Sequence, residues 1–98
     1  KIIREKHPLT PIAIFSPIYS PGREDTANVV GFTLKGMRGE IKRSVDILIS
    51  AGDKNLYYFD GLDILDADDV HLLEDGLHPN TEGYGLMAKN IIKMLDVI

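Results

Sequence analysis

The stretch PIAIFS at residues 11–16 decides the fold class of this chain. It is apolar almost to its end, a pattern typical of a strand that is buried on both faces in a parallel sheet. A second strand is expected at residues 55–59, which are rich in tyrosine and phenylalanine and end at Asp60 and Gly61. Residues 33–50, between the two strands, have the spacing of a helix. This order predicts a parallel sheet with a right-handed crossover.

The helix expected at residues 33–50 has one apolar face. Thr33 can cap its first turn, and Gly52 can adopt the left-handed conformation that often follows a last turn. The apolar residues recur at steps of three and four and form a single stripe: Leu34, Met37, Ile41, Val45 and Leu48. We therefore expect one side of this helix to pack and the other to face solvent.

Two further helices are expected at the ends of the chain. Residues 1–7 resemble the last turns of a helix that Pro8 stops, because the residue before a proline disfavours helical geometry. A longer helix is expected at residues 81–95, with Asn80 or Thr81 as its cap. Its apolar stripe would consist of Leu86, Ile91, Met94 and Leu95.

The composition excludes several classes of protein. The 98 residues include 15 acids and 11 bases, for a net charge of -4, whereas a nucleic-acid binder normally presents a basic face. The bases of the central helix, Lys35, Arg38, Lys42 and Arg43, are expected on a solvated face. No apolar run approaches the ~20 residues that span a bilayer. The lack of cysteine excludes disulfides and thiolate–zinc sites, and favours a cytoplasmic location only weakly, since many secreted bacterial proteins also lack cysteine.

Two strands alone make a poor sheet, because both outer edges remain unpaired. The chain also opens without methionine, in what resembles the end of a helix. We therefore expect residues 1–98 to be the C-terminal part of a single larger domain. An exposed sheet edge would also allow weak self-association.

Two loops should leave the carboxyl ends of the strands, where ligands bind in open α/β sheets. They are residues 17–28 and residues 60–79, the second with a short helical turn at residues 68–72. The second loop contains the sequence EDGLHPN, which carries the strongest chemical signal in the chain.

An aspartate three residues before a histidine can place its carboxylate against the imidazole. Here Gly76 lets the backbone turn, so that Asp75 can contact Nδ1 of His78. That contact fixes the tautomer and stabilises the imidazolium that forms when Nε2 accepts a proton from a nucleophile. The alternative is that Asp75 and Gly76 form an ordinary turn and His78 merely precedes a proline.

The sequence around this motif resembles the last conserved block of the SGNH, or GDSL-type, serine esterases. The resemblance rests on NLYYFDG at residues 55–61, DGLHPN at residues 75–80, and the pairs GY and MA at residues 83–84 and 87–88. It extends less specifically over the preceding strand and the long helix.

The resemblance implies a three-layer α/β/α, flavodoxin-like fold with a parallel sheet, of which this chain would be the C-terminal portion. It implies ester hydrolysis through an acyl-serine intermediate, with His78 as the general base and Asp75 as the residue that orients it. The substrate would be a small-molecule or carbohydrate ester. No cofactor, metal or nucleic acid is implied.

Other elements of the family have no match in this sequence. The GDS block with the nucleophile is absent, as are the glycine and the GxND asparagine of the oxyanion hole. Ser16 lies at the end of a strand but lacks GDS surroundings, so it is interpreted as the start of a loop. Because each oxyanion donor normally contributes ~10²-fold or more in rate, we expect the isolated chain to be inactive toward esters.

Three alternatives compete with the esterase hypothesis. The acids at residues 60–75 could hold a metal with His71 and His78, but their spacing matches neither a calcium loop nor a transition-metal template. A phosphate-binding turn would need more glycine than residues 16–28 contain. The third alternative is a non-catalytic α/β binding or assembly module derived from a hydrolase, which the fold class alone leaves open.

Overall fold

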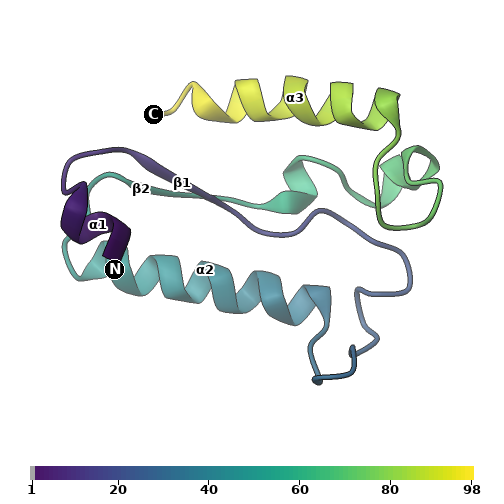
Figure 1. Ribbon diagram of the computed structural model, residues 1–98, viewed down its shortest axis with the longest axis horizontal. Coiled ribbons are helices and arrows are strands. Elements are labelled where there is room, and N and C mark those ends of the chain that lie inside the picture. Colours follow the sequence, from purple (N-terminus) through teal and green to yellow (C-terminus); the bar gives the residue numbers. More distant parts are fainter. Residues whose placement is uncertain (1) are drawn as a thin grey trace.

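The computed structural model describes residues 2–98 and is shown in Figure 1. Lys1, the first residue of the helix expected at residues 1–7, lies outside the described residues. The two elements written η are short 3-10 helices. The elements follow in the order α1 (Ile2–Lys6), β1 (Ile12–Phe15), α2 (Leu34–Ser50), β2 (Leu56–Phe59), η1 (Gly61–Asp63), η2 (Ala67–Leu72) and α3 (Thr81–Leu95).

The sheet is parallel, as the order of elements predicts. β1 and β2 pair in register from Ile12 opposite Leu56 to Phe15 opposite Phe59. The last pair is reinforced by ring stacking, with centroids 5.3 Å apart. Helix α2 lies on one side of the sheet and α3 on the other (Figure 1), so the chain has three layers. The predicted α/β/α class is confirmed.

Helix α2 begins and ends where its caps predict. The Thr33 hydroxyl accepts a hydrogen bond from the Gly36 N–H at 2.9 Å. Gly52, just beyond the end of the helix, has a φ of 113°, which favours glycine. Val45 is the most buried apolar residue of the helix, at 4% exposure.

Within residues 2–98, no helix combines the length and apolar character needed to cross a membrane.

The main apolar cluster lies between the loop at residues 60–79 and α3. Ile64, Leu65, Leu72 and Leu73 are each at most 5% exposed, and α3 packs against them. The α3 residues in this contact are Leu86, Met87, Ile91 and Met94. Leu95 was assigned to the apolar stripe wrongly, because it is 41% exposed at the last turn of the helix. This cluster fixes the loop that carries the Asp–His motif.

Two other expectations about burial are wrong. β1 is not buried on both faces, since its first three residues are half-buried and Phe15 is 36% exposed. A sheet of two strands leaves each strand with one unpaired edge, which accounts for this exposure. Arg38 does not lie on a solvated face of α2, because it is 6% exposed and forms an ion pair with Glu24.

Candidate functional site

The two loops at the carboxyl end of the sheet are bonded to each other. The Ser16 hydroxyl accepts hydrogen bonds from the Gly61 N–H at 2.8 Å and from the Tyr58 hydroxyl at 3.0 Å. A Cβ on Gly61 would lie 2.1 Å from the Pro17 carbonyl oxygen, so only glycine allows this close approach. Further along, the Tyr19 N–H donates to the Leu65 carbonyl at 3.0 Å. Ser16 is therefore a buried structural link between the loops, 4% exposed.

The segment that carries the motif is a closed turn. An isolated antiparallel bridge joins Leu73 to Pro79, so the two ends of the segment lie side by side. Within it, the Gly76 N–H donates to the Leu73 carbonyl at 3.0 Å. Gly76 has a φ of 75°, a left-handed conformation that glycine adopts without steric cost. Helix α3 follows at once, and the Asn80 side chain caps it by accepting from the Gly83 N–H at 2.8 Å.

The structure brings the two predicted site residues together. One carboxylate oxygen of Asp75, Oδ2, lies 2.6 Å from Nδ1 of His78. The other, Oδ1, accepts hydrogen bonds from the backbone N–H groups of Leu77 at 2.8 Å and His78 at 2.6 Å. The backbone of the turn thus orients the Asp75 carboxylate independently of its contact with the ring. The contact expected from the spacing of the motif is present.

The same hydrogen bonds determine the protonation of the pair. The backbone N–H of His78, then its ring, then the backbone N–H of Leu77 hold the pKa of Asp75 well below its ordinary value. An ionised carboxylate can only accept hydrogen bonds, so the 2.6 Å contact requires a proton on Nδ1 of His78. In the neutral ring, Nε2 then carries the lone pair. The arrangement can therefore accept a proton at Nε2 while the carboxylate stabilises the resulting charge.

The His78 ring is open to approach. The side chains of His78 and Asp75 are 69% and 54% exposed. Nothing within residues 2–98 is hydrogen-bonded to Nε2 of His78. The backbone that follows the ring is closely packed, because Gly83 at the start of α3 lies against Pro79 and Leu72.

Three of the remaining acids of the loop have structural contacts. Asp60 accepts from the Leu62 N–H at 2.9 Å and caps η1. Asp66 and Asp69 form a reciprocal capping box at the start of η2. Within the described residues, 2–98, no three side chains of the metal-binding types are grouped closely enough to hold an ion. His71, the other histidine of this loop, is exposed.

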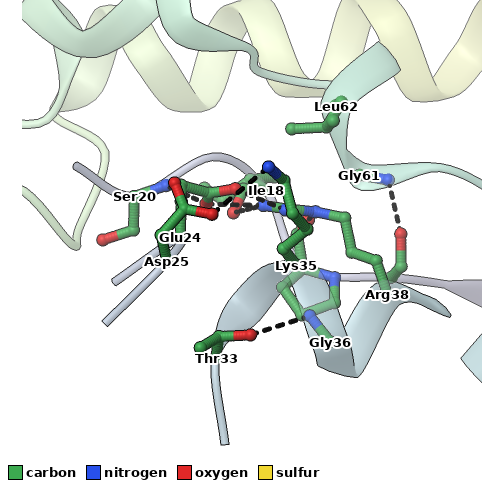
Figure 2. Close-up of polar contacts among 12 residues, drawn as sticks. Ile18, Ser20, Glu24, Asp25, Thr33, Lys35, Gly36, Arg38, Gly61 and Leu62 are labelled. Atoms are coloured by element: carbon green, nitrogen blue, oxygen red, sulfur yellow. Dashed lines mark hydrogen bonds and ion pairs between the residues drawn. The ribbon is translucent and has the colours of Figure 1, made fainter. Parts of the chain in front are cut away.

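A buried polar cluster that the sequence did not predict lies next to the motif, and Figure 2 shows it. Arg38 of α2 forms two hydrogen bonds with Glu24, and Glu24 accepts a third from the Ser20 N–H at 3.0 Å. The signal was the register of Arg38, which lies four residues after Leu34 and three before Ile41. This register places it beside the apolar stripe, where a solvated side chain is not expected.

The chain was compared with family models, curated protein sequences and solved structures. No family model matches the chain, and no curated protein sequence matches it. Among solved structures, the chain is similar to the salicylyl-acyltransferase SsfX3 from a tetracycline biosynthetic pathway, with 30% sequence identity and a TM-score of 0.80. The similarity covers 99% of this chain and 30% of that protein. The α/β fold is therefore shared over 99% of this chain, including the segment with the Asp–His motif.

Proposed function

We propose that this chain carries the acid–base part of an SGNH-type serine hydrolase site that cleaves a carboxylic ester. Asp75 and His78 would be two members of its triad. The serine nucleophile and the oxyanion donors would come from a segment outside residues 1–98. The single observation that carries the proposal is the 2.6 Å contact between Oδ2 of Asp75 and Nδ1 of His78, with the ring exposed on its other side.

The proposed reaction moves one proton through Nε2 of His78. As a serine hydroxyl attacks the acyl carbon, its proton passes to Nε2, and the Asp75 carboxylate stabilises the imidazolium without accepting that proton. When the bond to the alcohol breaks, Nε2 returns the proton to the departing oxygen. Water then attacks the acyl-serine and gives its proton to Nε2, and as the bond between the acyl carbon and the serine oxygen breaks, Nε2 passes that proton to the serine oxygen and the free acid is released.

A second candidate is acyl transfer to an alcohol other than water. It is favoured by the solved relative, which is an acyltransferase with 30% identity over 99% of this chain. The same two residues would serve both reactions, because activating an acceptor alcohol requires the same proton transfer as activating water. Transfer would differ in its acceptor site, which loops outside the Asp–His motif would form.

The test is ester hydrolysis by the complete protein that contains this chain, with His78→Ala compared to His71→Ala. Both histidines are exposed, and only His78 contacts a carboxylate at the motif. We expect His78→Ala to lower kcat/KM for p-nitrophenyl esters by about 10⁴-fold. His71→Ala should leave it unchanged, and both variants should keep the circular dichroism of the wild type.

The products separate the two candidates. Addition of an acceptor alcohol would yield a new ester if the protein is a transferase, and only free acid if it is a hydrolase. An active wild type that loses no activity in His78→Ala would contradict the proposal. A folded complete protein inactive toward all esters tested would favour the alternative of a binding or assembly module.

A further inference from the structure

A buried ion pair lies close to the loop that carries the Asp–His motif. Nη2 of Arg38 donates to Oε2 of Glu24 at 2.8 Å, and Nη1 donates to Oε1 at 2.5 Å. The Arg38 and Glu24 side chains are only 7% and 11% exposed. A two-bond contact of this kind fixes the orientation of both groups, not only their distance.

The same guanidinium holds the loop that follows β1. Nε of Arg38 donates to the Pro17 carbonyl at 2.7 Å, and Nη2 also donates to the Ile18 carbonyl at 2.9 Å. Figure 2 shows the arginine reaching from α2 into this loop. Since its fork is rigid, Arg38 sets the backbone from Pro17 to Ser20 relative to helix α2.

Ser20 connects this cluster to the motif. Its N–H donates to Oε2 of Glu24 at 3.0 Å, and its hydroxyl donates to the carbonyl oxygen of Gly76. Ser20 is 2% exposed, so water does not compete for either bond. Nη1 of Arg23 adds weaker contacts, 3.3 Å from the Ser20 hydroxyl and 3.5 Å from the Gly76 carbonyl. Gly76 is the residue that directly follows Asp75.

We propose that Arg38, Glu24 and Ser20 are positioning residues that fix the Gly76 peptide and thereby hold Asp75 against His78. The role assigned to them rests on the proposed function, but the geometry they maintain can be measured without it. The Asp–His segment is exposed, and among residues 2–98 the Asp75 carboxylate is hydrogen-bonded only to Leu77 and His78 of its own turn. The Ser20 hydroxyl makes the shorter of the two contacts, its own and that of Arg23, that link this turn to the buried cluster.

Arg38 and Glu24 are both charged at neutral pH. The hydrogen bonds from Arg38 lower the pKa of Glu24, against the opposing effect of its burial. The hydrogen bond to Glu24 in turn raises the pKa of Arg38. Both shifts favour the charged forms, so the ion pair is maintained at neutral pH.

The experiment is ¹⁵N NMR of the His78 ring in the full chain. Removal of the hydroxyl in Ser20→Ala should lower the ratio of the Nδ1-protonated to the Nε2-protonated tautomer about fivefold, the effect of losing one hydrogen bond. Ser20→Thr and Ser20→Val provide a matched pair of equal shape, of which only threonine keeps the hydroxyl. We expect the threonine variant to restore the wild-type ratio and the valine variant not to.

Asp25→Asn is the control for a nonspecific effect of changes in this loop. Asp25 follows Glu24 and forms an exposed ion pair with Lys35, at 3.2 Å, that has no contact with the motif. It should leave the tautomer ratio unchanged. A Ser20→Ala variant with lowered thermal stability and an unchanged tautomer ratio would show that Arg38, Glu24 and Ser20 have only a structural role. That result would overturn the proposal.

The outcome is also distinct from failure of the proposed function. If His78→Ala retains ester hydrolysis but Ser20→Ala shifts the tautomer ratio, the esterase assignment fails and the positioning role stands. If His78→Ala abolishes hydrolysis and neither Ser20→Ala nor Ser20→Val alters the ratio, the esterase assignment stands and the positioning role fails.

Discussion

The chain contains two ionic contacts of opposite character, joined through Ser20 and Gly76. The Arg38–Glu24 pair is buried, with side chains 7% and 11% exposed. The His78–Asp75 pair is open, with side chains 69% and 54% exposed. Both carboxylates also accept hydrogen bonds from backbone N–H groups, from Ser20 in the first pair and from Leu77 and His78 in the second.

The two pairs differ in whether they leave a polar side-chain atom free to contact another molecule. The guanidinium of Arg38 donates four hydrogen bonds, two to Glu24 and two to the carbonyl groups of Pro17 and Ile18, so the buried pair maintains the geometry of the loop. The exposed pair uses Nδ1 of His78 and leaves Nε2 without a partner among residues 2–98. A buried ion pair and an exposed Asp–His contact are thus separated in space and joined through the Ser20 hydroxyl, with a weaker contact from Arg23.

The largest expected effect comes from breaking the buried pair. Arg38→Ala leaves Glu24 buried without its partner, and such a change typically costs about 3–5 kcal/mol in the free energy of unfolding. Urea unfolding would measure the loss. The exposed pair of Lys35 and Asp25 gives the matched control, since Lys35→Ala should cost less than about 1 kcal/mol.

A double variant sharpens this comparison. Replacing both partners, with Arg38→Met and Glu24→Leu together, should recover much of the stability because no unpaired charge remains. If Arg38→Ala and Lys35→Ala proved equally mild, the buried pair would not be the constraint on the loops that we describe.

A smaller effect is expected in the titration of the exposed pair. The pKa of Asp75 is lower in the folded state than its ordinary value of 3.8. The stabilisation from its hydrogen bonds is therefore fully present when the pH is above 3.8, and it is lost as the pH falls through the lowered pKa. The ¹³C shift of the Asp75 carboxyl should therefore have its midpoint below 3.8. In His78→Ala the midpoint should rise only part of the way, because the backbone N–H groups of residues 77 and 78 still donate. A midpoint at or above 3.8 in the wild type would contradict the geometry.

The sequence predicted the contacts that form between near neighbours. The helix caps at Thr33 and Asn80 and the contact of Asp75 with His78 each join residues three apart or fewer along the chain. Such contacts depend on local turn chemistry, which the residue types specify. The parallel pairing followed from the alternation of strand and helix.

The parts that sequence reasoning missed depend on packing. Arg38 meets Glu24 across 14 residues, and Ser20 meets Gly76 across 56. A polar contact at that separation has no periodic signature, and charge alone suggested a solvated face for Arg38. The exposure of β1 was likewise missed because an apolar run indicates a strand but not how many neighbours cover it.

The most direct test of the account is the protonation of the His78 ring in the wild type and in Asp75→Asn. An ionised carboxylate at 2.6 Å requires the proton on Nδ1, which leaves Nε2 as the base. The asparagine amide can donate to Nδ1 instead, so the substitution should move the proton to Nε2. We predict ¹⁵N shifts of the Nδ1-protonated tautomer in the wild type and of the other tautomer in Asp75→Asn. A wild-type ring protonated on Nε2, or the same tautomer in both proteins, would contradict the account.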